Sequence, residues 1–129
     1  MRYVFAMVMT LGMGLATLQP AMADDCDADQ ASMNACAGRD LANADADLNR
    51  QYQAQMAYLT TPARKQALKN AQIKWIAFRD ADCLYQVGKP EDSGSIWPLL
   101  HAQCMAALTL QRVEQLKAYV ACRQEGCPD

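Results

Sequence analysis

The sequence predicts an all-α protein: a small disulfide-bridged three-helix bundle, made of a long helical hairpin plus a third helix. Three long segments carry apolar residues at the three- and four-residue steps of a helix. Turn-forming Gly and Pro residues separate these segments, and no segment shows the alternation typical of a strand. Six cysteines in 129 residues supply the cross-links of a small exported domain.

The first 23 residues have the pattern of a signal peptide. A positive residue at position 2 precedes an apolar run over 3–18, and Ala21-Met22-Ala23 suits a signal peptidase. Cleavage near Ala23 leaves one helical domain over 24–129 in the periplasm or secreted medium. The apolar run is shorter than the roughly 20 residues that span a bilayer. Two aspartates directly precede Cys26, which disfavours lipidation, so we expect no stable membrane anchor.

Capping residues predict where the helices begin and end. Asp29 suits an N-cap, and a helical apolar period then continues to Leu59. Thr61-Pro62 opens a second helix that runs to about Val87 and folds back on the first as an antiparallel hairpin. The Gly- and Pro-rich segment 88–95 is expected to be an exposed loop, and a third helix follows from about Pro98 to Arg123.

We expect the second predicted helix to be the centre of the bundle. One stripe of it joins a large aromatic, a cation, an amide and a thiol: Leu68, Gln72, Trp75, Arg79 and Cys83. Trp75 is expected to anchor the core, and the polar members need partners if they are buried. We expect a structural network in which Arg112 pairs with Asp45 while Arg79 bonds carbonyls or Asp40.

The cysteines indicate an oxidising compartment, and all six follow the predicted cleavage point: Cys26, Cys36, Cys83, Cys104, Cys122 and Cys127. The bundle brings the first four to one pole, where two schemes fit disulfide geometry. The favoured scheme pairs Cys36 with Cys83 and Cys26 with Cys104. The other pairs Cys26 with Cys36 and Cys83 with Cys104. In both, the last two cysteines close the tail.

Composition disfavours several functions. With a formal net charge of -2, the protein is a poor partner for nucleic acid and would attract a basic protein. His101 is the only histidine, and the cysteines lack the ligand spacing of zinc sites. Asp45 and Asp47 face different sides of a helix, so they do not form a glycosidase-type pair. We therefore expect that the protein is not an enzyme and that it binds no cofactor.

Motif residues in three segments together resemble a known family. They are Asp45, Leu48, Asn49, Tyr52, Gln72, Trp75, Arg79, Asp80, Arg112 and Leu116, with Cys26, Cys36, Cys83 and Cys104. This set is similar to the LprI-like lysozyme inhibitor N-terminal domain and spans essentially the whole predicted mature chain. The resemblance implies a secreted, disulfide-bridged α-helical domain, some of whose relatives inhibit lysozyme. Cys122 and Cys127 are additional to the family's four-cysteine pattern.

Two functional hypotheses follow. The first is an inhibitor of lysozyme or a related peptidoglycan hydrolase that acts by surface contact. Its candidate contact is the loop from Lys89 to Trp97, with Glu91 and Asp92 as rim charges and Trp97 as an anchor, unless Trp97 packs under the loop against the third helix. The alternative is a binding or immunity module of the cell envelope without enzymatic activity.

Overall fold

A computed structural model describes residues 25–128, and the predicted signal peptide lies outside them. Over this range the protein is an all-α bundle without strands, as predicted. Three long helices, α1 (Gln30–Tyr58), α2 (Pro62–Val87) and α4 (Trp97–Ala121), account for most of it. The connection expected to be an exposed loop is mostly exposed, and it contains a short helix, α3 (Pro90–Ser93), and a 3-10 turn, η1 (Gly94–Ile96).

Side-chain caps set the helix starts, as the sequence predicts. Asp29 accepts a hydrogen bond from the backbone N–H of Ser32 at 2.7 Å, which begins α1. Thr61 Oγ1 accepts from the N–H of Arg64 at 3.3 Å and begins α2. Gly88 ends α2 with a φ of 80°, a left-handed conformation that costs glycine little.

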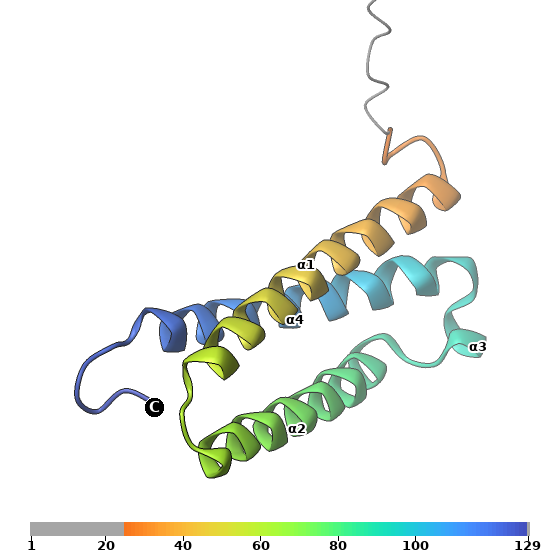
Figure 1. Cartoon of the computed structure of the whole chain (residues 1–129). Coiled ribbons are helices and arrows are strands. Elements are labelled where there is room, and N and C mark those ends of the chain that lie inside the picture. Colours follow the sequence, from red (N-terminus) through yellow and green to blue (C-terminus); the bar gives the residue numbers. More distant parts are fainter. Residues whose placement is uncertain (1–24, 129) are drawn as a thin grey trace, which may run out of the picture.

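The long helices do not pack equally on one another. Figure 1 shows α4 running beside α1, with α2 on the other side of the molecule. The main contacts are between α1 and α4 and then between α2 and α4, whereas α1 and α2 touch little despite their short connection. Small buried side chains allow the close approach of α1 and α4: Ala37, Ala44, Ala102 and Ala106.

The apolar core lies where the three long helices meet. Leu48, Val113 and Leu116 are buried at its centre, and partly buried side chains surround them: Tyr52, Leu68, Trp75 and Tyr119. The buried side chains of α2 are different in character, because they are Gln72, Arg79 and Cys83. The inner face of α2 therefore combines the apolar contacts of Leu68 and Trp75 with polar and disulfide-bonded side chains.

The disulfides correct the favoured pairing. Cys26 bonds to Cys36 and Cys83 bonds to Cys104, each with a Cα–Cα distance of 5.7 Å. Pairing of Cys36 with Cys83 was based on a tight α1–α2 hairpin and is wrong, because α2 packs on α4 instead. The segment that leads into α1 folds back along its first turns, which brings Cys26 to Cys36.

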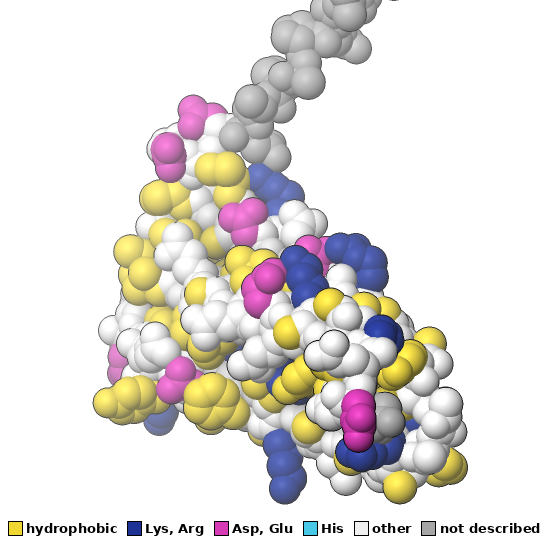
Figure 2. All heavy atoms as spheres, turned by 90° about the vertical axis from the view of Figure 1, so that its left-hand side faces the viewer, with side chains coloured by type: hydrophobic (Ala, Val, Ile, Leu, Met, Phe, Trp, Pro, Cys, Tyr) yellow, Lys and Arg dark blue, Asp and Glu magenta, His cyan; other side chains and the backbone are white. Residues whose placement is uncertain are grey.

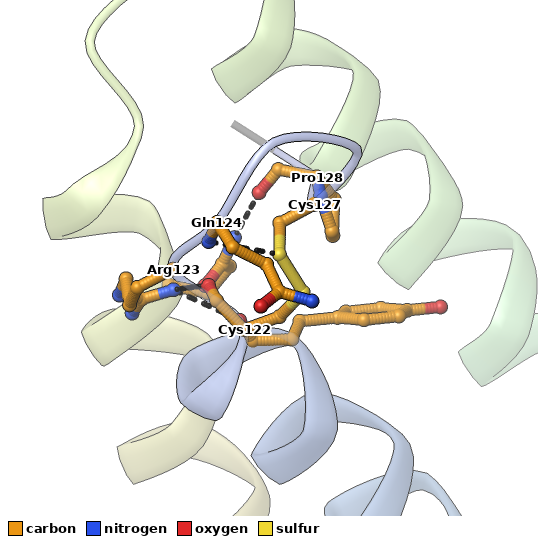
Figure 3. The surroundings of a disulfide bond; sticks show 7 residues. Cys122, Arg123, Gln124, Cys127 and Pro128 are labelled. Atoms are coloured by element: carbon orange, nitrogen blue, oxygen red, sulfur yellow. Dashed lines mark hydrogen bonds between the residues drawn. A yellow bond between two sulfur atoms is a disulfide. The ribbon is translucent and has the colours of Figure 1, made fainter.

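The tail is held at the opposite pole by the third disulfide, Cys122–Cys127, which is the pairing expected for it. Figure 3 shows the loop that this bond closes, in which the N–H of Gln124 points toward Cys127 Sγ at 3.3 Å. Gln55 of α1, only 1% exposed, donates from Nε2 to the Pro128 carbonyl at 2.8 Å. The tail therefore covers the end of α1.

Candidate partner-binding site

Arg79 of α2 joins the three long helices. Its Nη1 donates to Asp45 Oδ1 of α1 at 2.9 Å and to Thr109 Oγ1 of α4 at 3.0 Å. Its Nε donates to Asp80 Oδ1 at 3.1 Å, and its side chain is 10% exposed. Two carboxylates and a hydroxyl satisfy this nearly buried cation, so its role here is structural.

Arg112 of α4 forms a separate set of hydrogen bonds. Its Nε donates to Gln72 Oε1 at 3.2 Å and its Nη1 to Gln115 Oε1 at 3.0 Å. The expected pairing of Arg112 with Asp45 is wrong, and so is that of Arg79 with carbonyls or Asp40. Asp45 lies level with Thr109, about one helical turn from Arg112 along α4, so it meets Arg79.

Trp75 lies between these two cations. The guanidinium carbon of Arg79 is 5.3 Å from the ring centroid and that of Arg112 is 6.0 Å away. The indole also packs against the core that contains Leu48 and Leu116. Most of the motif residues thus serve the core and its polar border, although Asn49 and Asp80 are exposed.

The loop residues proposed for partner contact divide into two kinds. Glu91 and Asp92 are exposed on α3, where they are available to a partner. Trp97 is half-buried: its Nε1 donates to the Gly88 carbonyl at 2.9 Å, and its ring stacks on His101 with centroids 4.3 Å apart. These contacts fit packing under the loop better than an anchor in a partner.

A groove of about 610 Å³ lies between α1 and α4, and we name it the α1–α4 groove. Its apolar lining comes from both helices: Met33, Ala37, Ala44, Leu99, Ala106, Ala107 and Leu110. Three carboxylates lie around it, Asp27, Asp40 and Asp47, and none of the described residues that line it is Lys or Arg. Asp47 also pairs with Arg50 outside the groove. The groove therefore combines an apolar floor with acidic edges.

Sequence reasoning did not find this groove, although a signal for it exists. Asp40, Asn43 and Asp47 follow one another at helical steps, which places them on one face of α1. Leu99, Gln103 and Leu110 do the same on α4. What the sequence did not reveal was that these two faces border the same groove, since that depends on α4 lying beside α1.

Charge is distributed unevenly along the bundle axis. Carboxylates are frequent at the pole where α1 begins and α2 ends: Asp25, Asp27, Asp29, Asp40, Asp80, Asp82, Glu91 and Asp92. Figure 2 shows some of these as magenta side chains at the top, where α1 begins. Cations are frequent toward the other pole: Arg64, Lys65, Lys69, Lys74, Lys117 and Arg123. The lining of the α1–α4 groove includes Asp27 and Asp40 of the acidic pole.

The described residues show neither a cluster of metal ligands nor a membrane-spanning helix. Across residues 25–128, no three His, Cys, Asp or Glu side chains lie close enough together to hold a metal ion. No helix within the same range is long and apolar enough to cross a membrane. The single histidine is the one stacked on Trp97.

The fold and groove describe a small disulfide-bridged helical domain with an acidic concave surface. Residues 22–116 match the family model described as "Lysozyme inhibitor LprI", and the chain belongs to this family. It is also similar to an uncharacterised protein of Rhizobium meliloti (strain 1021), with 34% identity over 100 residues that cover 68% of this chain and 71% of that protein. No solved structure matches the chain.

Proposed function

We propose that this protein inhibits lysozyme or a related peptidoglycan hydrolase through surface contact alone. The family to which the chain belongs carries lysozyme inhibition in its description, which supports the kind of partner. The proposal is carried by the acidic, apolar-floored α1–α4 groove, together with the exposed carboxylates of α3 next to α4. A basic enzyme would be attracted to this pole and would bury apolar surface on reaching it.

The contact surface in this proposal has two parts. The α1–α4 groove receives a convex, basic segment of the enzyme between Asp27, Asp40 and Asp47. Glu91 and Asp92 project from α3 next to the start of α4 and approach a second basic region. This contact would cover residues around the active-site cleft of the enzyme. Inhibition would therefore need no covalent chemistry.

The cysteines support the place of action. Among residues 25–128 no cysteine is free, and the three disulfides are of the kind that persists in an oxidising compartment. This agrees with export to the periplasm or medium after cleavage near Ala23. Cell-wall hydrolases act in that same space, so inhibitor and enzyme would meet there.

A turbidity assay with the mature protein, residues 24–129 with disulfides intact, tests the proposal. Purified lysozyme clears a suspension of cell walls, and micromolar inhibitor is expected to slow the clearing. The groove variant Asp27→Lys/Asp40→Lys and the loop variant Glu91→Lys/Asp92→Lys are each expected to weaken inhibition about tenfold or more. The matched control Glu114→Lys/Glu125→Lys makes the same change in net charge away from the groove.

The outcomes separate the function from the surface. If wild-type protein at micromolar concentration leaves clearing unchanged, lysozyme inhibition is wrong and the envelope binding or immunity module becomes the better hypothesis. If inhibition occurs but all three variants inhibit equally, the function stands and the assignment of the contact surface is wrong.

A further inference from the structure

Helix α2 exposes the side chains that a core helix would bury. Its buried residues are Gln72, Arg79 and Cys83, whereas Ile73 is 54% exposed and Ile76 is 38% exposed. Phe78, Leu84 and Tyr85 of the same helix are exposed as well. Figure 2, in which α2 lies along the lower side, shows yellow hydrophobic side chains at the surface there. Clustered exposed apolar side chains of this kind mark interaction surfaces.

Part of this surface forms one wall of a second groove, which we name the α1–α2 groove. It has a volume of about 410 Å³ because α1 and α2 touch little. Lys69, Ile73 and Ile76 line it from α2. Asp45, Leu48, Asn49 and Tyr52 line it from α1, and Gln72 and Arg79 also border it. The groove is thus open beside an apolar helix face.

The spacing of residues along this wall is the same in both directions, and its two ends carry opposite charges. Lys69, Ile73, Ile76 and Asp80 follow at steps of four, three and four, which keeps them on one stripe of the helix. Asp80 accepts one bond from Arg79 and yet has a side chain that is 54% exposed. When a second α2 is laid antiparallel, Lys69 meets the Asp80 of that copy while Ile73 meets its Ile76.

We propose that a second copy of this chain occupies the α1–α2 groove and that the protein forms an antiparallel dimer through α2. A two-fold interface must be self-complementary, with residue i against j and j against i, and the stripe meets this requirement. Its two isoleucines supply the apolar centre and its Lys–Asp pairs supply the ends. Binding of a partner protein with an unrelated sequence would not require this stripe to be self-complementary.

The charges along the whole helix support the same orientation. The first half of α2 carries Arg64, Lys65, Lys69 and Lys74. The second half carries Asp80 and Asp82, and its one cation, Arg79, is buried against Asp45 and Thr109. Antiparallel pairing places each basic half against an acidic half, whereas parallel pairing would place like charges together. No residue of α2 lines the α1–α4 groove, so this dimer leaves the proposed inhibitory surface uncovered.

Sedimentation velocity of the mature, disulfide-intact protein tests the proposal. Wild type is expected to sediment as a concentration-dependent dimer at up to about 100 µM. Ile76→Glu places a charge at the apolar centre twice per dimer and is expected to raise the dissociation constant at least about tenfold. Phe78→Glu is the matched control, because Phe78 is 57% exposed on the same helix but lies off the stripe, so it should dimerise as wild type does.

Zero-length carbodiimide cross-linking tests the register. Lys69 and Asp80 lie eleven positions apart on one continuous helix, about 16 Å, so they cannot be joined within a chain. Mixing ¹⁴N- and ¹⁵N-labelled protein should give Lys69–Asp80 cross-linked peptides of mixed isotope composition. A monomer at every concentration, a dimer that Ile76→Glu leaves unchanged, or a dimer without this cross-link would each overturn the proposal. The proposal would also be overturned if the protein stayed monomeric and bound an unrelated protein through α2.

Discussion

Arg79 Nη1 lies 2.9 Å from Asp45 Oδ1, and this ion pair joins α2 to α1, two helices that otherwise touch little. The same nitrogen donates to Thr109 of α4, whose side chain is fully buried. One guanidinium therefore fixes how three helices lie relative to one another. The Cys83–Cys104 disulfide adds a covalent bond between α2 and α4.

Replacing Arg79 by Met should destabilise the fold. The Thr109 hydroxyl would lose its partner in a buried place, and Asp45 would lose its cation, so we expect a loss of about 2 kcal/mol in the free energy of unfolding. Urea denaturation of the two proteins measures the difference. Arg50→Met is the control, because its ion pair with Asp47 is exposed and should contribute less than about 1 kcal/mol. Equal effects of the two substitutions would contradict the structural role of Arg79.

The Cys83–Cys104 disulfide should contribute more stability than the tail disulfide. In the chain-entropy model the separation of 21 residues corresponds to about 3 kcal/mol, and the separation of 5 at Cys122–Cys127 to about 2 kcal/mol. Cys83→Ala/Cys104→Ala should also release α2, which the tail bond does not hold. Thermal unfolding of the two double variants compares them. A lower melting temperature for the tail variant would show that α2 does not depend on its bridge.

The N-cap residue of α1, Asp29, should make the free energy of unfolding depend on pH under acidic conditions. Hydrogen bonding from the backbone N–H of Ser32 lowers the pKa of Asp29 below its ordinary value of 3.8. Because the pKa of Asp29 is lower in the folded state, the stability that its ionised side chain contributes is complete above the unfolded-state pKa. That stability is lost as the pH falls through the folded-state pKa. Asp29→Asn keeps a capping oxygen without the charge. The difference in free energy of unfolding between wild type and this variant, measured by denaturation, should therefore shrink as the pH falls from 6 through the folded-state pKa of Asp29. A difference that stays constant with pH would contradict a charged N-cap.

Replacing Trp97 by Phe should loosen the connection between α2 and α4. Phenylalanine preserves an aromatic ring against His101 but cannot donate to the Gly88 carbonyl. We expect a loss of about 1 kcal/mol and faster amide hydrogen exchange over residues 88–96. Unchanged exchange in that segment would indicate that the indole hydrogen bond does not hold the loop, and would return Trp97 to the candidates for partner contact.

The helix boundaries were predictable because their signals are local. Asp29, Thr61 and Gly88 act on backbone groups within a few residues, so each can be found from the sequence alone. The disulfide partners of Cys36 and Cys83 were not predictable in this way. They depend on which helices pack together, and the sequence alone did not show that α4 would take the place of α1 as the neighbour of α2.

The candidate site was only partly predictable for the same reason. Glu91 and Asp92 were found because the Gly- and Pro-rich connection predicts exposure, and they are exposed on α3. Asp40 was considered only as a partner for Arg79, and the structure places it at the α1–α4 groove instead. Helical spacing marks the two faces that border this groove, but the sequence does not show that they lie side by side until the packing of α1 and α4 is known. The small alanines that let α1 and α4 approach gave the best available indication.

In the proposed function, a rigid helical body acts on a lysozyme-type enzyme by contact alone. Gel filtration of the mature protein mixed with an equimolar amount of lysozyme tests it most directly. At about 0.1 M salt we predict a joint peak of larger size that has lost lytic activity, and separation of the two proteins as salt screens the acidic pole. Two separate peaks at low salt, with the enzyme fully active, would contradict the claim.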